Sequence, residues 1–361
     1  GRELDLYSGG LKIYTTINAE MQQNAEEAVQ EHLGNYQRIF DIIKEDRKYG
    51  PFYFDEDPAG NVKRIVDRAM KNTQRYRGMK RRGASQDSIQ RAFNTSIPMT
   101  VFTWNGDKDT VLSPRDSIMY YKGLYQVGMM SVEPQSGHVK AWVGGNDYQY
   151  FKYDHVKQGK RQVGSTFKPF VYSLAIQNGL SPCYEVPNVP VIFQKDKWGM
   201  EDDWSPKNSD GLYGCNVSLK YGLANSMNTV TAWVLSQYGS DAPQNVIRLA
   251  RKMGITSYLP PVPSICLGVA DLSLFEMVGA NSTFVNKGVW TEPIFITRIE
   301  DKNGNVIQDF IPETREAMSE ETAYVMLNLM KGVVDGVYSQ CMGDKMKANR
   351  DKNGRGSVMY R

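Results

Sequence analysis

Two short motifs contain residue types that can carry out acyl transfer through a serine. Ser165 and Lys168 form a Ser-x-x-Lys tetrad directly after Gly164, and Ser226 and Asn228 form a Ser-x-Asn triplet further along the chain. A serine hydroxyl is a poor nucleophile unless a neighbouring base takes its proton. Lys168 can be that base only if burial lowers its pKa.

The spacing within the tetrad predicts how its two side chains meet. A helix that begins at Ser165 places the hydroxyl at the amide-rich positive end and the Lys168 amine one turn along the same face. Pro169 agrees with this start, because proline is tolerated in the first turn of a helix. Taken alone, such a tetrad is more typical of an ordinary solvated helix.

The Ser-x-Asn triplet has two interpretations. On a loop, its hydroxyl and amide can face one cleft, with Ser226 relaying a proton and Asn228 orienting Lys168 or a substrate amide. Isolated serine and asparagine residues, however, are more typical of helix N-caps. Taken singly, the triplet favours the cap.

The elements around these motifs follow from periodicity and turn chemistry. Residues 10–18 alternate apolar and polar types and predict a strand, after which Asn18 caps a helix over residues 19–32. Residues 124–132 and 138–145 predict an antiparallel hairpin around a turn at 133–137. The later expectations are a mainly helical region over 165–253 with a loop at 186–213, and a strand-turn-strand unit over 294–307.

Residues 49–125 differ in composition from their surroundings, with interspersed glycine and proline and a basic stretch, and predict an inserted, largely helical module. Its later part, 101–107, is expected to be a hairpin strand leading into a turn. Its basic residues are Lys63, Arg64, Arg68, Lys71, Arg75, Arg77, Lys80, Arg81 and Arg82. They could contact an anionic polymer or membrane surface, but a solvated helix face interspersed with Asp67 and Asp87 is the more ordinary interpretation.

Length, composition and charge limit the number of domains and the classes of partner. With 361 residues, 41% of them apolar and 23% charged, the chain is expected to form one large domain and a smaller one. The net charge of +3, from 43 basic and 40 acidic residues, gives no overall field that favours a nucleic-acid or strongly acidic partner. No run approaches the ~20 apolar residues of a membrane span. The opening residues 1–6 indicate a cut from a longer polypeptide.

The remaining reactive residue types form no recognisable site. Cys183, Cys215, Cys266 and Cys341 lack the spacing of a metal site and are expected to be mostly small buried hydrophobes; a disulfide between two of them would suit an exported protein. The histidines, among them His138 and His155, are too scattered for a serine-histidine triad. Trp204 and Asn208 could line a cleft, although a tryptophan in such a loop is more often a packing anchor.

The order of the two motifs and their surroundings resembles the penicillin-binding transpeptidases of bifunctional, class A cell-wall synthases. The resemblance covers nearly the whole chain. The matching segments are residues 10–17, 142–145, 161–162, 164–170, 204–208, 224–228, 267–268 and 332–336. It implies an α/β (α+β) fold of the serine β-lactamase and penicillin-binding type, in which helices flank an antiparallel sheet.

The resemblance also implies a reaction and its participants. Ser165 would be the acylated nucleophile, Lys168 its base, and Ser226 and Asn228 the second catalytic motif, with Gly164, Thr166, Trp204 and Asn208 as expected substrate contacts. The substrates would be peptidoglycan stem peptides ending in D-alanyl-D-alanine, and β-lactam antibiotics would acylate the same serine. No metal or cofactor is expected. Other cell-wall synthesis proteins are expected partners.

The resemblance predicts a division of the chain and a location in the cell. Residues 1–48 would lead into the transpeptidase region, 49–124 would form the linker or insertion module, and 125–361 would form the transpeptidase domain. The protein would work at the outer face of the cytoplasmic membrane, held by an N-terminal anchor upstream of Gly1. The glycan-polymerising domain of bifunctional relatives is absent from these residues, so that activity is not assigned.

One family motif is missing. These enzymes have a Lys-Thr-Gly or Lys-Ser-Gly triplet on a strand that lines the cleft, and neither occurs among the 361 residues. The simplest interpretation is that the C-terminal strands are truncated, which would leave a sheet edge unfilled. Two alternatives therefore stand beside the transpeptidase: an inert peptidoglycan-binding scaffold and a β-lactamase-like hydrolase on the same fold.

Overall fold

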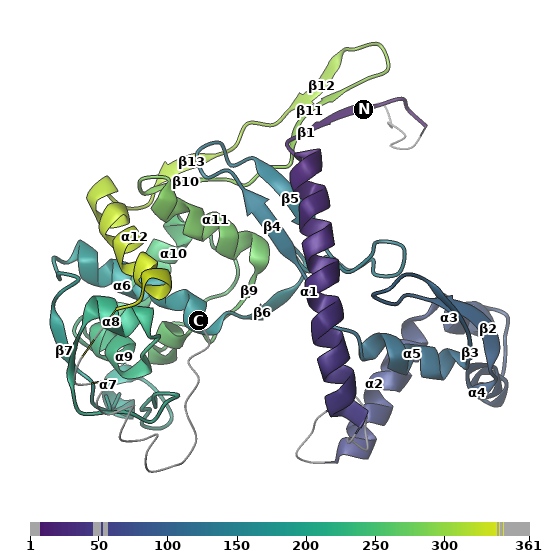
Figure 1. Cartoon of the computed structure of the whole chain (residues 1–361), viewed down its shortest axis with the longest axis horizontal. Coiled ribbons are helices and arrows are strands. Elements are labelled where there is room, and N and C mark those ends of the chain that lie inside the picture. Colours follow the sequence, from purple (N-terminus) through teal and green to yellow (C-terminus); the bar gives the residue numbers. More distant parts are fainter. Residues whose placement is uncertain (1–7, 46–51, 53–56, 338, 340–341, 343–361) are drawn as a thin grey trace. The chain divides into compact units, whose positions relative to one another are not determined.

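The computed structural model describes residues 8–45, 52, 57–337, 339 and 342, and its elements are labelled in Figure 1. Two compact units divide the chain. Unit 1 takes the described residues of Gly1–Gln22, Gly128–Trp142 and Tyr153–Arg361, and unit 2 those of Gln23–Val127 and Val143–Lys152. Cys341 and the C-terminal residues 343–361, on which the sequence raised expectations, lie outside the described part.

Unit 1 is built on helices that surround a buried helix, α6 (Lys168–Gln177). Every α6 side chain from Lys168 to Ala175 is buried, and Phe170 stacks on Phe167 with ring centroids 4.7 Å apart. A helix that is apolar on nearly all sides must be covered on all sides. The helices packed against it are α8 (Leu219–Ala224), α9 (Asn228–Ser236), α10 (Ala242–Lys252) and α12 (Glu320–Asp335).

The strands of unit 1 form small sheets. The pairs are β4 (Met129–Val132) with β5 (Val139–Val143), β6 (Lys160–Gln162) with β9 (Asp271–Ser273), β7 (Glu185–Pro187) with β8 (Asn216–Ser218), and β10 (Val289–Thr291) with β13 (Thr314–Glu316). Helix α11 (Leu274–Val285) follows β9 directly, and α7 (Lys195–Trp198) lies in the long loop between β7 and β8.

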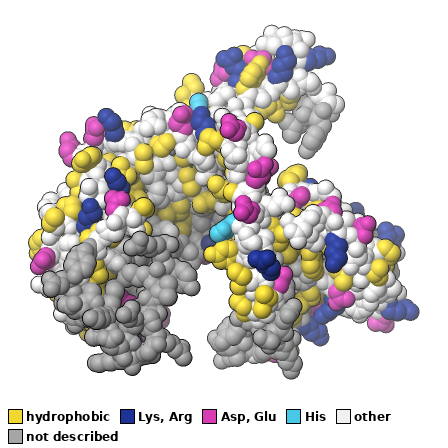
Figure 2. All heavy atoms as spheres, viewed as in Figure 1, with side chains coloured by type: hydrophobic (Ala, Val, Ile, Leu, Met, Phe, Trp, Pro, Cys, Tyr) yellow, Lys and Arg dark blue, Asp and Glu magenta, His cyan; other side chains and the backbone are white. Residues whose placement is uncertain are grey.

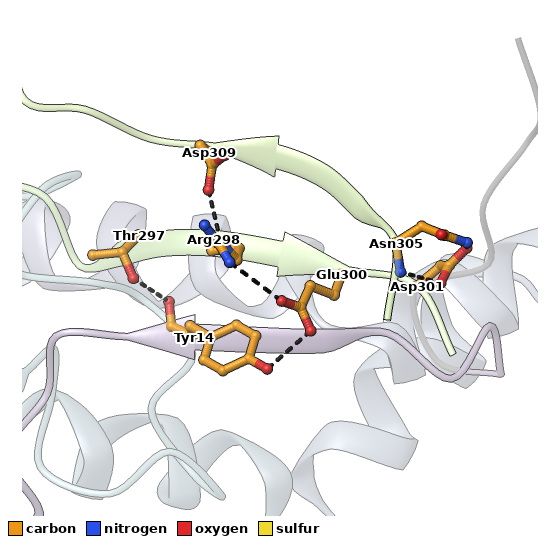
Figure 3. Close-up of polar contacts among 7 residues, drawn as sticks. All are labelled: Tyr14, Thr297, Arg298, Glu300, Asp301, Asn305 and Asp309. Carbon is orange, nitrogen blue, oxygen red and sulfur yellow. Dashed lines mark hydrogen bonds and ion pairs between the residues drawn. The ribbon is translucent and has the colours of Figure 1, made fainter. Parts of the chain in front are cut away.

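The remaining sheet pairs a strand near the start of the described chain with two strands far along the sequence. Strand β1 (Lys12–Thr15) pairs antiparallel with β11 (Ile296–Glu300), which pairs with β12 (Val306–Asp309). Figure 3 shows the side-chain links: Tyr14 donates to Glu300, and Arg298 pairs with Asp309 at 2.8 Å. Asp301 accepts from the Asn303 and Asn305 N–H groups and so closes the β11–β12 turn. The predicted first strand and the late strand-turn-strand unit are confirmed.

Helix α1 (Ala19–Glu45) starts in unit 1 and passes into unit 2 at Gln23; it is longer than the helix predicted over residues 19–32. Unit 2 continues with α2 (Pro58–Asn72), α3 (Gln74–Arg81), α4 (Gln86–Asn94), the antiparallel pair β2 (Ile97–Val101) and β3 (Lys108–Leu112), and α5 (Pro114–Lys122). Helices α2 to α5 each begin at a side chain that accepts a first-turn N–H: Asp57, Thr73, Ser85 and Ser113.

The hairpin strand expected at 101–107, leading into a turn, is present but lies earlier in the chain. Strand β2 ends at Val101 and pairs with β3, and Thr103 and Gly106 form the turn, in which Phe102 and Trp104 pack edge to face. A second strand prediction was wrong in position. The strand expected from residue 124 begins only at Met129, because the Tyr125 N–H is taken by the Gln37 side chain. In both places, residues expected in a strand instead pack their side chains elsewhere: Phe102 against Trp104, and Tyr125 against Phe40 of α1.

Glu276 fastens the start of α11 to the loop that precedes it. Its carboxylate, only 9% exposed, accepts hydrogen bonds from the N–H and hydroxyl groups of Thr256, Ser257 and Ser273. Burial alone raises a carboxyl pKa, but these donors outweigh it and lower the pKa of Glu276 to about 2. The ionised form therefore stabilises the β9–α11 junction.

We predict that Glu276→Gln removes a pH-dependent part of the stability. Because the folded pKa lies below the unfolded value, this stabilisation is complete above the unfolded pKa and is lost as pH falls toward the folded one; at full size it is about 3 kcal/mol. Urea unfolding should show a larger gap between wild type and variant at ~pH 7 than at ~pH 3. The exposed Glu316→Gln is the control, and an equal gap at both pH values would contradict the assignment.

Candidate active site

The segment that holds Ser165 is fixed by strand pairing up to the residue before it. Strand β6 pairs with β9, and the pairing continues as Val163 N donates to Ala270 O at 3.1 Å and Gly164 N to Gly268 O at 2.9 Å. Gly164 has a φ of 55°, a left-handed conformation that glycine adopts without strain. The chain thus leaves the strand pair at Ser165.

Ser165 does not begin an α-helix, which corrects the geometry predicted from the tetrad. Residues Gly164–Phe167 form a 3-10 turn, and α6 begins at Lys168. The Thr166 hydroxyl donates to Val163 O at 2.7 Å, and the Lys168 N–H bonds Ser165 O, so the first turn is tighter than an α-helix. Ser165 and Thr166 are exposed, whereas Lys168 is buried.

Lys168 is the centre of the site. Its side chain is 1% exposed, and its amine donates to Ser226 O at 2.6 Å, Ser226 Oγ at 3.0 Å and Asn228 Oδ1 at 2.7 Å. Burial lowers the pKa of Lys168 to about 8, because an ammonium loses its hydration in the protein interior. The structure therefore brings together Lys168, Ser226 and Asn228, with Ser165 on the preceding turn.

Ser226 reaches Lys168 by adopting a strained backbone. Its φ is 52°, in the left-handed region that costs a residue with a side chain about 1–2 kcal/mol. In this conformation both its carbonyl and its hydroxyl oxygen bind the same amine. The predicted N-cap role does not apply to Ser226, since no side-chain cap precedes α9 at Met227.

Asn228 is the first residue of α9, and its amide is held at both ends. Oδ1 accepts from Lys168, and Nδ2 donates to Lys207 O at 2.8 Å. The backbone N–H groups of Asn228 and Thr229 both donate to Asn208 Oδ1, at 3.0 and 3.1 Å. Asn208 therefore caps α9 from a distant loop and fixes the residue that holds Lys168.

Two residues that the sequence did not single out complete this support. Asn188 and Thr229 are fully buried; Thr229 Oγ1 donates to Asn188 Oδ1 at 2.7 Å, and Asn208 Nδ2 donates to the same oxygen at 2.8 Å. Asn208 itself is 7% exposed and its amide is fully engaged within the protein. Its burial favours a positioning role over the substrate contact suggested by sequence.

Trp204 lies in the same loop and is half buried. It exchanges two backbone hydrogen bonds with Phe193, and their rings lie 5.3 Å apart. This contact anchors the loop that continues to Lys207 and Asn208. Packing is thus the role that the structure displays for Trp204.

The cysteines follow different patterns. Cys266 is a buried free thiol whose pKa burial raises to about 12, Cys183 is an exposed free thiol, and Cys215 is disulfide-bonded. Residues 8–45, 57–337 and the few described beyond them contain no cluster of histidine, cysteine and acidic residues that could hold a metal. Across those same residues, no helix is long and apolar enough to cross a membrane.

An apolar groove of about 720 Å³ lies beside the Gly164–Phe167 turn. Its lining includes Val163, Thr166 and Leu272, together with Met277 and Val278 of α11. The hydrophobic side chains that gather over this part of unit 1 are visible in Figure 2. The groove borders β6, which has a single strand partner among the described residues.

Comparison with known proteins identifies the family that this chain resembles. Residues 127–255 match the family model for the penicillin binding protein transpeptidase domain, and residues 47–125 that for the penicillin-binding protein middle domain. Penicillin-binding protein 1A of Aquifex aeolicus is 26% identical over 336 residues, 91% of this chain and 44% of the relative. Penicillin-binding protein 2D of Bacillus subtilis is 34% identical over 211 residues, 58% of this chain and 30% of the relative.

Solved structures share the fold. The crystal structure of penicillin-binding protein 1A from Haemophilus influenzae superposes with a TM-score of 0.61 at 20% identity, covering 92% of this chain and 55% of that one. PonA1 from Mycobacterium tuberculosis gives 0.55 at 18% identity, covering 91% and 65%. The chain spans less than half the length of the curated relatives it matches.

We predict that Gly268→Ala displaces the Gly164–Phe167 turn that holds Ser165. Gly268 has a φ of 73°, and a Cβ there would lie 2.0 Å from Gly164 O. Gly179→Ala is the matched control, because Gly179 has a φ of 86° and open space around it. Both variants should lose about 1–2 kcal/mol from backbone strain, and Gly268→Ala considerably more from the clash. Equal melting temperatures for the two variants would contradict this.

Proposed function

The chain belongs to the penicillin-binding protein family and contains its transpeptidase domain, and from this premise we propose that it cross-links peptidoglycan stem peptides through an acyl-enzyme on Ser165. One observation supports the proposal above the others: a buried lysine with a lowered pKa, one turn from an exposed serine, is hydrogen-bonded to Ser226 and Asn228. An inert scaffold has no need of this costly burial.

In the first half-reaction, Ser165 Oγ attacks the carbonyl before the terminal D-alanine of a stem peptide. Neutral Lys168 takes the serine proton as the carbon–oxygen bond forms. The tetrahedral oxyanion needs donors, and the Ser165 backbone N–H can be one of them. When the intermediate collapses, the carbon–nitrogen bond breaks and D-alanine leaves with a proton returned by Lys168, directly or through the Ser226 hydroxyl.

In the second half-reaction, the amine of a neighbouring stem attacks the acyl-enzyme. Its proton passes to Lys168, the ester bond to Ser165 Oγ breaks, and the serine recovers its proton. Asn228 holds the lysine in place throughout, since its amide is fixed between Lys168 and Lys207 O. A β-lactam would enter through the same first step, because its strained amide presents an equivalent carbonyl to Ser165.

The substrate also implies where the protein works. Stem peptides are cross-linked outside the cytoplasmic membrane, so we place the chain at its outer face, with an upstream segment as the expected anchor. The alternative of a β-lactamase-like hydrolase differs in one measurable respect, since a hydrolase releases the acyl group rapidly to water. A long-lived adduct would therefore favour the transpeptidase.

We predict that benzylpenicillin adds one equivalent of its mass to the wild-type chain and none to Ser165→Ala. Intact-mass spectrometry measures the adduct, and its decay after removal of free antibiotic gives the deacylation rate. Ser205→Ala is the control, because Ser205 is also an exposed serine of unit 1. Labelling of Ser165→Ala at the wild-type rate would sink the assignment of the nucleophile.

We also predict that the acylation rate of the wild type rises with pH through about 8. Below the pKa of Lys168 the amine is protonated and has no lone pair for the Ser165 proton, and above it the rate should level off. Stopped-time intact-mass measurements across this range give the profile. Lys168→Arg should acylate at least about a hundredfold more slowly at every pH, because arginine stays charged. A flat wild-type profile would count against Lys168 as the base.

A further inference from the structure

The positive charge of this chain is concentrated on two helices of unit 2. Residues 57–82 contain nine basic and two acidic residues, a net charge of +7, while the whole chain has +3. The rest of the chain is therefore net negative. These residues form α2 and α3, and α3 has no buried residue. A charge excess so localised indicates an anionic partner at this place.

Two of these cations, Arg64 and Arg68, line a pocket of about 390 Å³ between α2 and α5 together with Lys122. Its lining residues are Asn61, Arg64, Ile65, Arg68, Ala69, Asn72 and Lys122. The six residues from α2 recur at spacings of three and four, so they lie along one face of that helix. Lys122 comes from the last turn of α5, which packs against α2. The pocket thus joins charges that lie far apart in sequence.

The acidic residues at α2 pair with only one of the three cations of this pocket. Asp67 pairs with Arg115 at 3.6 Å, and Asp57, the N-cap of α2, forms an exposed ion pair with Arg64 at 4.0 Å. In the part of the chain that the structure describes, no carboxylate lines the pocket, and Arg68 and Lys122 have no ion-pair partner. Cations that line one pocket repel one another unless an anion lies between them.

The donors favour a phosphate group as that anion. Two guanidinium groups at i and i+4 present planar pairs of N–H donors that match phosphate oxygens, and the lysine adds a third positive charge. The Asn61 and Asn72 amides lie beside them on the same helix face. The cavity exceeds a single oxyanion, so it leaves space for the group to which the phosphate is attached.

We propose that the pocket between α2 and α5 binds a phosphate group through Arg64, Arg68 and Lys122. The ligand is either a phospholipid headgroup or a soluble phosphate, which share this chemistry. The site stands apart from the acyl-transfer chemistry, so its test does not depend on Ser165.

Phosphorus NMR titration of the full chain with inorganic phosphate, at constant ionic strength and with acetate as the competing anion, tests the pocket. Wild type should bind phosphate in preference to acetate. Arg68→Gln and Lys122→Gln should each weaken binding about tenfold, the effect of removing one charged hydrogen-bond partner. Arg81→Gln is the matched control, because Arg81 is an exposed arginine of the same basic stretch on α3 and does not line the pocket.

Phosphate binding no stronger than acetate binding would overturn the proposal, and so would equal weakening by all three variants, which would mean diffuse surface charge. Sedimentation with phosphatidylcholine vesicles, with and without phosphatidylglycerol, then separates the two sources. Vesicle binding that needs phosphatidylglycerol and is lost in Arg68→Gln and Lys122→Gln but kept in Arg81→Gln supports the headgroup. Binding of inorganic phosphate with the same variant pattern, and no vesicle binding, supports a soluble phosphate.

Discussion

The burial of one amine, that of Lys168, is the constraint on which the rest of the site depends. An ammonium taken out of water is unstable unless it finds partners or loses its proton. Here three oxygens from two residues surround it, and its pKa still falls to about 8. Ser226 accepts a left-handed backbone to supply two of those oxygens. The strain at Ser226 and the burial of Lys168 are therefore two parts of one arrangement.

Residues that do not contact the Lys168 amine fix the positions of the residues around it. Asn208 caps α9 and so fixes Asn228, and Asn188 and Thr229 fix Asn208 by buried hydrogen bonds. On the other side, the β6–β9 pairing extends to Gly164, and Glu276 fastens the end of β9 to α11. Buried polar groups that are all paired rigidify their neighbourhood. Ser165 itself is exposed, so its position depends on these rigid neighbours.

The sequence predicted which residues meet at the candidate site better than it predicted their geometry. Ser165, Lys168, Ser226 and Asn228 are distinctive because two motifs occur in a set order, and the first and last strand predictions rested on clear alternation. The 3-10 turn at Ser165 was not predictable from spacing, since it depends on the Thr166 hydroxyl and on pairing with residues 268–270. Asn188 and Thr229 gave no local signal, because their roles come from contacts across 20 to 41 positions. The hairpin strand expected over 101–107 lies earlier, at 97–101, and Phe102 and Trp104 pack as an aromatic pair in the turn that follows it.

The hydrogen bonds of Lys168 also assign different roles to its partners in the proposed reaction. As an ammonium, Lys168 has three N–H donors, and the three oxygens use them all. The Ser226 carbonyl and Asn228 Oδ1, at 2.6 and 2.7 Å, can only accept, so they keep their donors when the amine loses a proton. The Ser226 hydroxyl, at 3.0 Å, can accept from the ammonium or donate to the neutral amine. It is thus the partner whose hydrogen bond can reverse as the proton moves, which makes Ser226 the suitable relay and Asn228 the fixed support.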